Sequence, residues 1–203
     1  MYAKEESLSI FQGACKYVIP ESSSLYVWNK NSLEEFWDKL ISKKEKVFLG
    51  NACFKSRCET LDTLILGGQD VLITLSILIK CLLSHYSKNE EKICNILKER
   101  IFQKSLVLKE DTLTAKASPR IEILNSDKAA YEAVLYDSVD EKSIHPIICA
   151  YKYFQDNIKG ATPDEINYII EKVTDNQCNL LFVFFLQADD DKELYLNVLS
   201  GSQ

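Results

Sequence analysis

The clearest pattern in the sequence is a helical spacing of hydrophobic residues between positions 70 and 87. Most of the apolar residues in this segment fall on one side of a helical wheel, but Ile73 and Ile77 fall on the other side, among serines and a lysine. Large aliphatic residues on both sides indicate a helix that is covered on both sides. The segment is therefore predicted to be either the central helix of the domain or part of an interface with a partner.

Other helices are predicted from signals at their first residues. Ser32 and Glu35 have the spacing of a capping box, in which each side chain satisfies a backbone N–H of the first turn. The run Thr162-Pro163-Asp164-Glu165 combines the same signal with a proline at the first helical position. Further helices are expected to begin at Asn89, Ser126 and Pro146.

Strands are predicted where β-branched and aromatic residues cluster. These segments are residues 7–11, 17–19, 25–28, 47–49, 105–108, 120–124, 180–186 and 193–199. Residues 60–66 fit either a strand or the first turns of a helix, and Gly67-Gly68 ends both. Together these elements predict a single α+β domain over residues 1–203. The middle of the chain is rich in helices, and strands lie toward both ends. Residues 1–6 could form a short exposed segment before this domain.

The composition is that of a soluble globular protein, with 46% hydrophobic and 27% charged residues among 203. Uncharged apolar runs stay well short of the roughly 18 residues that a membrane-spanning helix needs, and the first residues lack a secretion signal. Seven cysteines at irregular spacings fit reduced thiols packed as small hydrophobic side chains. The expected location is the cytoplasm or the nucleus.

The charge balance is acidic, with 30 Asp and Glu against 24 Lys and Arg and a net charge of −6. Broad binding of nucleic acid needs clustered basic residues that neutralise phosphates. The densest basic stretch, residues 43–46, is short and interrupted by Glu45, which is typical of a solvated surface. Nucleic acid is therefore not expected as a partner of this chain alone.

The glycine pair invites comparison with a phosphate-binding loop, because a predicted strand precedes it and a predicted helix follows it. Gly67 and Thr74 match the pattern G-x-x-x-x-G-K-[ST], but Leu72 and Ile73 stand where a glycine and a lysine are required. Asp70 near the start of the helix would also repel phosphate. The segment is interpreted as a turn before a helix, with a degenerate nucleotide-binding fold as the alternative.

A zinc site is the second chemistry that the sequence allows. Cys81 and His85 are four residues apart on a predicted helix, which places two ligands on one face, and Cys53 and Cys58 complete the best available set. His145 does not suit such a pair, because a residue before proline is pushed out of the helical region. No C-x-x-C pair is present. No metal or other cofactor is expected, and this set remains an alternative.

These observations favour a non-enzymatic subunit or adaptor that binds protein partners in an intracellular hetero-oligomer. The candidate partner-binding residues are Ile73 and Ile77 on the central helix, together with the aromatic residues Trp28 and Tyr153, because such side chains are enriched at interfaces. Two alternatives stay open: a catalytically inactive subunit with a P-loop nucleotide fold, and an enzyme that uses a cysteine or a bound zinc ion.

Overall fold

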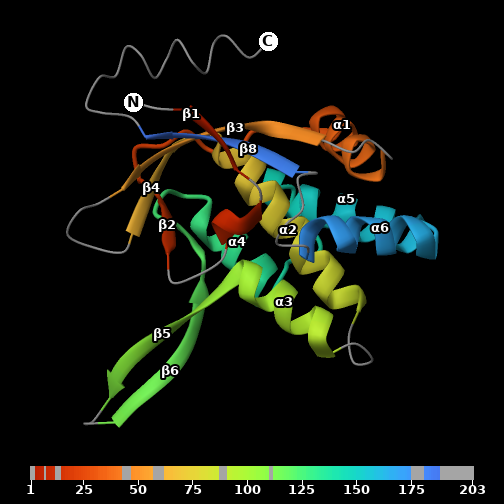
Figure 1. Ribbon diagram of the computed structural model, residues 1–203. Coiled ribbons are helices and arrows are strands. Elements are labelled where there is room, and N and C mark those ends of the chain that lie inside the picture. The colour runs from red at the N-terminus through yellow and green to blue at the C-terminus, as the bar shows by residue number, and fades with distance from the viewer. Residues whose placement is uncertain are drawn as a thin grey trace.

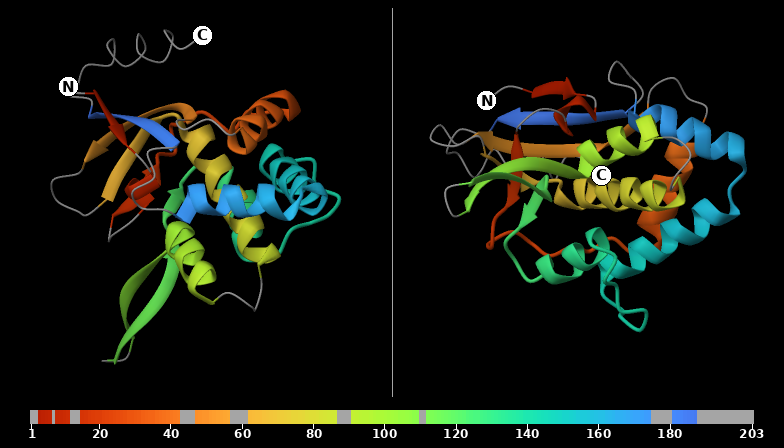
Figure 2. Two further views of the ribbon diagram at one scale, coloured as in Figure 1. Left: turned by 45° about the vertical axis from the view of Figure 1, so that its right-hand side comes forward. Right: turned by 90° about the horizontal axis from the view of Figure 1, so that it is seen from below.

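A mixed sheet forms one side of the molecule, and helices pack beneath it (Figures 1 and 2). The computed structural model describes residues 3–6, 8–11, 15–42, 47–56, 62–86, 91–109, 112–174 and 181–187. The strands are β1 Ala3–Glu6, β2 Lys16–Ile19, β3 Val47–Ser56, β4 Asp62–Gly67, β5 Phe102–Lys109, β6 Thr112–Pro119, β7 Ile121–Ile123 and β8 Leu181–Gln187. The helices are α1 Lys30–Ile41, α2 Gln69–His85, α3 Glu91–Ile101, α4 Lys128–Leu135, α5 Pro146–Gly160 and α6 Pro163–Thr174, with a 3-10 turn at Leu8–Phe11.

The large sheet has the strand order β1-β8-β3-β4-β2-β7. Strand β2 lies between β4 and β7 and is parallel to both, with Tyr17 opposite Thr63 on one side and Ile121 on the other. Strand β3 is antiparallel to β4 and parallel to β8, and β1 is antiparallel to β8. The three neighbouring parallel strands therefore end at the same edge of the sheet.

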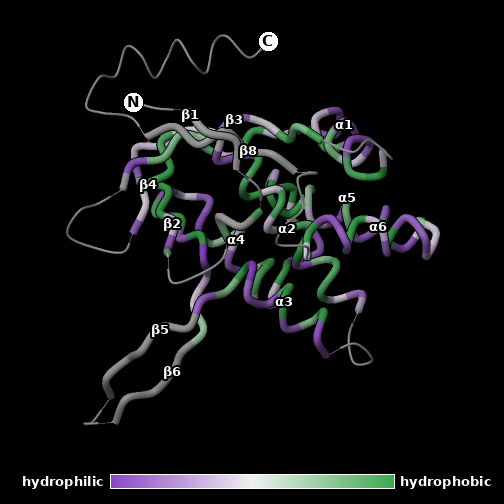
Figure 3. The backbone as a smooth tube through the Cα atoms, viewed as in Figure 1, coloured by the Kyte–Doolittle hydropathy of each residue, from purple (hydrophilic) through white to green (hydrophobic). Residues whose placement is uncertain are grey.

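Helix α2 is the centre of the core. It contacts strand β3 and helices α3, α4 and α5, and its residues from Gln69 to Leu82 are buried almost without exception. Figure 3 shows hydrophobic residues in green where the sheet and the helices meet, and hydrophilic residues in purple toward the outer ends of helices such as α6. The α+β fold predicted from the sequence is confirmed. The spacing of α2 allowed either the central helix of the domain or part of an interface, and the structure shows the central helix.

The helix starts test the capping predictions directly. In α6, Glu165 Oε2 accepts the backbone N–H of Thr162 at 2.8 Å, and Glu165 N donates to Thr162 Oγ1 at 3.3 Å, so this capping box is confirmed. The prediction for α1 is wrong, because Asn29 caps that helix by accepting the N–H of Ser32 at 3.2 Å. An asparagine three residues upstream replaces the expected pair of Ser32 and Glu35.

Several predicted strands differ from the observed elements. Residues 8–11 form a 3-10 turn, and residues 25–28 have no regular secondary structure because their backbone bonds to side chains of other segments. Residues 117–119, which lie between the strands predicted at 105–108 and 120–124, belong to β6. The strand expected at 193–199, the cap expected at Asn89 and the basic run 43–46 lie outside the described residues. Within the described chain, no helix is long and apolar enough to cross a membrane.

Strands β5 and β6 form a separate two-stranded ribbon. They pair antiparallel along their whole length, from Phe102 opposite Pro119 to Lys109 opposite Thr112. Figures 1 and 2 show this ribbon projecting away from the sheet and the helices. Helix α3 meets β5 at the base of the ribbon.

Candidate functional site

The carboxyl ends of β4, β2 and β7 bring three distant connections together. Residues 68–70 follow β4, residues 20–29 follow β2, and residues 124–127 follow β7. In sheets with parallel strands, ligands bind outside the carboxyl ends of the strands, where loops from neighbouring strands converge. A functional site of this fold is therefore expected at this edge.

Gly68 makes the tight turn from β4 into α2. Its φ of 73° lies in the left-handed region, and a Cβ atom at this position would lie 2.0 Å from the carbonyl oxygen of Asn51 and 2.8 Å from Cα of Ala52. Only glycine fits a backbone that passes this close to a neighbouring strand. The turn places Gln69 and Asp70 in the first turn of α2, at the carboxyl edge.

Asp127 joins two of the three connections. Its Oδ2 atom accepts the backbone N–H of Tyr26 at 2.7 Å, and its Oδ1 atom lies 3.3 Å from Nε2 of His145 at the start of α5. The residue is 2% exposed. Because a buried carboxylate needs donors to replace its hydration, these contacts explain how the charge is accommodated.

His145 uses both ring nitrogens within the chain. Its Nδ1 atom accepts the N–H of Ile147 at 3.3 Å, which caps α5, and its Nε2 atom faces Oδ1 of Asp127. The backbone of His145 is extended, with φ −60° and ψ 134°, as expected before Pro146. In this arrangement His145 orients Asp127 and the start of α5.

Asp70 is the second carboxylate at this edge. Its Oδ1 atom accepts the N–H of Val27 at 3.2 Å. Burial raises the pKa of Asp70 above the usual 3.8; the bond from Val27 opposes this shift, and the negative charge of Asp127 adds to it. A carboxyl in this environment holds its proton at a higher pH than a solvated aspartic acid, which is a property found in functional sites.

Two amides complete the arrangement around residue 24. Gln69 Nε2 donates to Ser24 Oγ at 2.6 Å and to its carbonyl oxygen at 3.4 Å, and Asn125 Nδ2 lies 3.5 Å from the carbonyl oxygens of Ser23 and Ser24. We call Gln69, Asp70, Asn125, Asp127 and His145 the carboxyl-edge cluster. Together they hold the connection after β2 against the first turn of α2 and the loop before α4.

Exposed hydrophobic residues border the carboxyl-edge cluster. Four large hydrophobic residues are exposed, and Ile144 is the most exposed of them at 89%: Leu25, Val27, Leu124 and Ile144. Val27 itself bonds to Asp70, Leu124 precedes Asn125, and Ile144 precedes His145. Most large hydrophobic residues of a soluble protein are at least partly covered. A polar cluster with an apolar border is typical of surfaces that bind ligands or partners.

Buried polar residues of α2 find partners below this edge. Thr74 Oγ1 and Tyr26 Oη are 2.7 Å apart, and so are Ser76 Oγ and Tyr131 Oη. Burial raises the pKa of both tyrosines, and the hydroxyl partners oppose the shift only in part, so the phenols stay protonated. These hydrogen bonds compensate the loss of water around the polar side chains of α2, which is covered on all sides.

The structure places the four candidate partner-binding residues in different environments. Ile73 is 1% exposed and Ile77 is fully buried, both in the core of this chain, so they offer a partner no accessible surface. Trp28 packs against Phe36 with the two rings inclined at 63°, Tyr153 packs against Phe154, and both remain partly accessible. The structure does not bring the four together, and partner binding at Trp28 and Tyr153 stays a prediction.

The described residues of the zinc alternative do not form a metal site. Cys53 and Cys81 are buried, burial raises the pKa of each thiol, and the Cys81 thiol lies 3.7 Å from the carbonyl oxygen of Tyr151. His85 is exposed, and Cys58 lies outside the described residues. Among the residues that the structure describes, no group of three or more His, Cys, Asp or Glu side chains has the arrangement of a metal site.

A separate hollow of about 410 Å³ lies at the corner of α1, α5 and α6. Its lining residues are Trp37, Asp156, Asn157, Gly160, Ala161 and Glu165. Glu165 belongs to the capping box of α6, and its bonds to Thr162 lower its pKa. None of the lining residues belongs to the carboxyl-edge cluster, so this hollow is a distinct feature of the surface.

Sequence reasoning misses most of the carboxyl-edge cluster. The linear pattern draws attention to the glycine pair and Asp70, but around Asn125 and Asp127 it indicates only the start of a helix. The missing information is the parallel pairing of β2 with β4 and β7, since that pairing alone places the three connections side by side. A parallel order cannot be inferred from strands as short as Ile121–Ile123.

Comparison with known proteins gives one family. The family model described as GmrSD restriction endonuclease, N-terminal domain, matches residues 7–198, nearly the whole chain. No curated protein matches the sequence. A family of restriction endonucleases overturns the interpretation as a non-enzymatic adaptor, and neither of the two alternatives matches that family. It also contradicts the expectation that nucleic acid is not a partner. The chain belongs to the GmrSD restriction endonuclease N-terminal domain family.

Proposed function

We propose that this protein acts on DNA as a component of a restriction endonuclease. The observation that carries the proposal is the family match over residues 7–198, which includes every strand of the sheet except β1, the helices and the ribbon. Hydrolysis of phosphodiester bonds in DNA is the reaction of a restriction endonuclease. The substrate class is therefore double-stranded DNA.

The acidic total charge does not by itself exclude DNA as a substrate. Residues 91–120, which form α3, the ribbon and the residue before β7, contain seven basic residues against four acidic ones, but two of the basic residues, Arg100 and Arg120, are buried and bonded to carbonyl oxygens within the chain. Binding to a polyanion depends on the local potential of the contacting surface more than on total charge. The argument from total charge failed because the net charge does not describe the local charge of a contacting surface.

The carboxyl-edge cluster is the part of the molecule to which we assign a functional role beyond folding. Burial and the charge of Asp127 both oppose ionisation of the Asp70 carboxyl group. A neutral side chain with an acceptor oxygen would bond equally to the N–H of Val27 in the connection after β2. Residues whose charge is unfavourable for stability are typical of functional sites. The apolar border formed by Leu25, Val27 and neighbouring residues supports the same assignment.

The test uses the purified chain and two readouts. Binding is measured by fluorescence anisotropy with a labelled duplex about two helical turns long, and cleavage is measured on supercoiled plasmid with Mg²⁺ and, as a control, with EDTA. A dissociation constant at or below about 10⁻⁴ to 10⁻⁶ M, the usual range for non-specific DNA binding at physiological salt, supports the proposal. Nicking or linearisation of the plasmid also supports it.

A chain that neither binds the duplex nor alters the plasmid overturns the proposal. The variant Asp70→Asn separates the role of the carboxyl-edge cluster from that of the whole chain. If this variant folds and loses DNA cleavage or DNA-dependent activity, the assignment of the cluster is supported. If it retains full activity, the cluster serves only the fold.

A further inference from the structure

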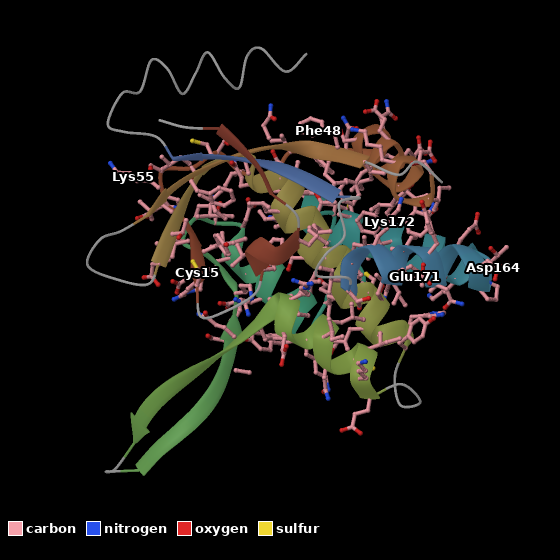
Figure 4. The ribbon with its side chains drawn as sticks, in the orientation of Figure 1. Cys15, Phe48, Lys55, Asp164, Glu171 and Lys172 are labelled. Carbon is pink, nitrogen blue, oxygen red and sulfur yellow. The ribbon has the colours of Figure 1, made fainter. Side chains whose placement is uncertain are left out.

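The hollow of about 410 Å³ between α1, α5 and α6 has the size of a small binding site. Figure 1 shows these three helices together at one side of the molecule, and Figure 4 shows Asp164, in the first turn of α6, at the outer edge of that side. Ligand pockets have volumes of roughly 300–1,000 Å³. The hollow is therefore suited to a ligand about as large as one amino-acid side chain with its adjoining peptide groups.

Trp37 of α1 gives the first indication of what the hollow binds. The residue is only 7% exposed, and it lines the hollow. Its ring packs against Phe154 with the two centroids 6.3 Å apart, which fixes its orientation. The indole N–H, the one polar group of this side chain, makes no hydrogen bond to the residues that the structure describes. Because buried indole N–H groups usually have a partner, this donor requires an acceptor from a molecule in the hollow.

Two carboxylates line the same hollow, and its described lining contains no lysine, arginine or histidine. Asp156 is exposed and has no ion pair or hydrogen bond within the described chain. Glu165 Oε2 accepts from both N and Oγ1 of Thr162 at 2.8 Å, which leaves Oε1 available. These bonds lower the pKa of Glu165, so the group is charged at neutral pH. The lining therefore favours a cation.

The neighbouring part of α1 adds negative charge. Burial raises the pKa of Tyr153 on α5, and the charges of Glu34 and Asp38 add to the shift, so both carboxylates lie near this part of α5. Glu34 pairs with Lys30 at 3.5 Å, whereas Asp38 has no ion pair within the described residues. Helix α5 also ends at the hollow with Gly160, and the C-terminal end of a helix carries partial negative charge. The positive end of α6 at the same corner is already capped by its own capping box.

The two kinds of lining group together define the chemistry of the ligand. A phosphate or a free carboxylate would satisfy the indole N–H of Trp37, but the carboxylates of Asp156 and Glu165 would repel it. A simple polyamine carries positive charge but has no acceptor for the indole. An arginyl group has a guanidinium and, beside it, a neutral carbonyl oxygen. Guanidinium groups also bind carboxylates through two parallel hydrogen bonds.

We propose that the hollow between α1, α5 and α6 binds an arginyl group, with its guanidinium at Asp156 and Glu165 and its carbonyl oxygen at Nε1 of Trp37. The ligand chemistry follows from the unpartnered donor, the two carboxylates and the absence of a basic residue in the described lining. The proposal is independent of the proposed action on DNA. It assigns a second binding site, which shares no residue with the carboxyl-edge cluster.

The test follows the indole N–H signals by two-dimensional ¹H–¹⁵N NMR of the whole chain. The protein has two tryptophans, so the spectrum of Trp28→Phe identifies the signal of Trp37. The probes are N-acetylarginine amide and an acetylated, amidated pentapeptide with one arginine between alanines. Both are expected to move the Trp37 signal to saturation, and the Trp28 signal is expected to move less. The same two probes with citrulline, the neutral isostere of arginine, are expected to bind about tenfold more weakly, because hydrogen bonds to charged groups are the stronger ones.

Two variants test the assigned contacts. Asp156→Asn removes a carboxylate from the hollow, and Glu171→Gln makes the same charge change near the other end of α6 as a control (Figure 4). Asp156→Asn is expected to weaken binding of N-acetylarginine amide about two- to fivefold, as for an exposed ion pair, and Glu171→Gln should leave it unchanged. Trp37→Phe keeps a ring against Phe154 but lacks the donor, and it is expected to weaken binding about two- to tenfold, measured on the signals of neighbouring backbone amides. Thermal melts show whether each variant is folded.

The probes also separate the possible sources of the arginyl group. Equal affinity for both arginine probes supports the site and shows that a single arginyl group suffices, whereas tighter binding of the pentapeptide supports it and identifies a protein segment as the source. Equal binding of arginine and citrulline probes overturns the proposal, and so does spermidine that moves the Trp37 signal equally well. No change of that signal up to about 10 mM probe, the weak end of measurable affinity, shows that the hollow holds only water and also overturns it. Because the test contains no DNA, its failure would leave the proposed function intact.

Discussion

The backbone N–H of Tyr26 donates a 2.7 Å hydrogen bond to Oδ2 of Asp127, and the two residues are 101 positions apart in the sequence. This bond ties the connection after β2 to the loop after β7, across the carboxyl edge of two neighbouring parallel strands. The other oxygen of Asp127 lies 3.3 Å from His145, which extends the link to α5. One buried carboxylate therefore connects three segments that local interactions alone would leave apart.

Replacing Asp127 by alanine should destabilise the fold clearly. The change leaves the N–H of Tyr26 without its acceptor in a buried position, which costs about 1–3 kcal/mol in the free energy of unfolding. Urea denaturation followed by circular dichroism measures the effect. Asp127→Asn keeps one oxygen for Tyr26 and should lose less, and Asp156→Asn on the exposed side of α5 is the control. A stability of Asp127→Ala within about 0.5 kcal/mol of wild type, the usual range for surface changes, would contradict this account.

Asp70 gives a prediction about pH. Its folded-state pKa is raised above 3.8, so the folded protein holds this proton more tightly than the unfolded chain does. The stability that Asp70 contributes is therefore present at pH below about 3.8 and is lost as the pH rises through the raised value. Asp70→Asn removes this loss. The difference in melting temperature between Asp70→Asn and wild type should be more positive near neutral pH than near the ordinary pKa of an aspartic acid, about 3.9.

The control for this comparison is Asp156→Asn, whose side chain is exposed. Its effect on the melting temperature should be similar at the two pH values. A destabilised Asp70→Asn variant at neutral pH would mean that the bond from Val27 to the charged carboxylate outweighs burial. In that case the charge of Asp70 would serve the fold, and the functional assignment of the carboxyl-edge cluster would lose its main support.

Local signals predict single elements well. The capping box of Thr162 and Glu165, the proline at the start of α5 and the turn at Gly67-Gly68 all depend on neighbours within a few residues, and each is confirmed. The α+β class follows from the order of such elements. The long apolar segment at 70–87 also indicates correctly that one helix is covered on both sides.

Features that depend on distant partners escape the sequence. Residues 25–28 are aromatic and β-branched and resemble a strand, but the backbone N–H groups of Tyr26 and Val27 bond to Asp127 and Asp70 in place of a neighbouring strand. The interface interpretation of Ile73 fails for a related reason. A residue on the less apolar side of a helix is buried when other helices and strands surround that side as well. The sequence of the helix itself does not show how many elements will pack around it.

Lys172 leads to a prediction about the contact between α6 and α1. It is fully buried, and its ammonium donates to the carbonyl oxygens of Leu40 at 2.8 Å and Ser42 at 2.9 Å, at the C-terminal end of α1 (Figure 4). The last carbonyl groups of a helix need such donors. Lys172→Met keeps an apolar stem but removes the donors, and it should lower the free energy of unfolding by about 1–3 kcal/mol.

The matched control is Lys159→Met on the exposed surface of α5, which should stay within about 0.5 kcal/mol of wild type. Urea denaturation of both variants measures the difference. A more stable Lys172→Met variant is the contrary result, because it would mean that removing the ammonium from water outweighs its bonds to the carbonyl groups, as happens for some buried ion pairs.

Two glycines provide the sharpest test of the turn that positions the carboxyl-edge cluster. At Gly68, alanine would place its Cβ 2.0 Å from the carbonyl oxygen of Asn51, and a left-handed φ of 73° adds about 1–2 kcal/mol of strain for any residue with a side chain. Since β3 backbone must move to relieve the contact, Gly68→Ala should unfold or severely destabilise the chain. A methyl group at Gly160, at the end of α5, would meet no neighbouring atom of the described residues within 4 Å, so Gly160→Ala should be neutral or stabilising by up to about 1 kcal/mol. The melting temperatures of the two variants test this prediction. Equal melting temperatures would show that the close approach of β3 to Gly68 does not constrain the turn. In that case the turn would not fix the positions of Gln69 and Asp70 either.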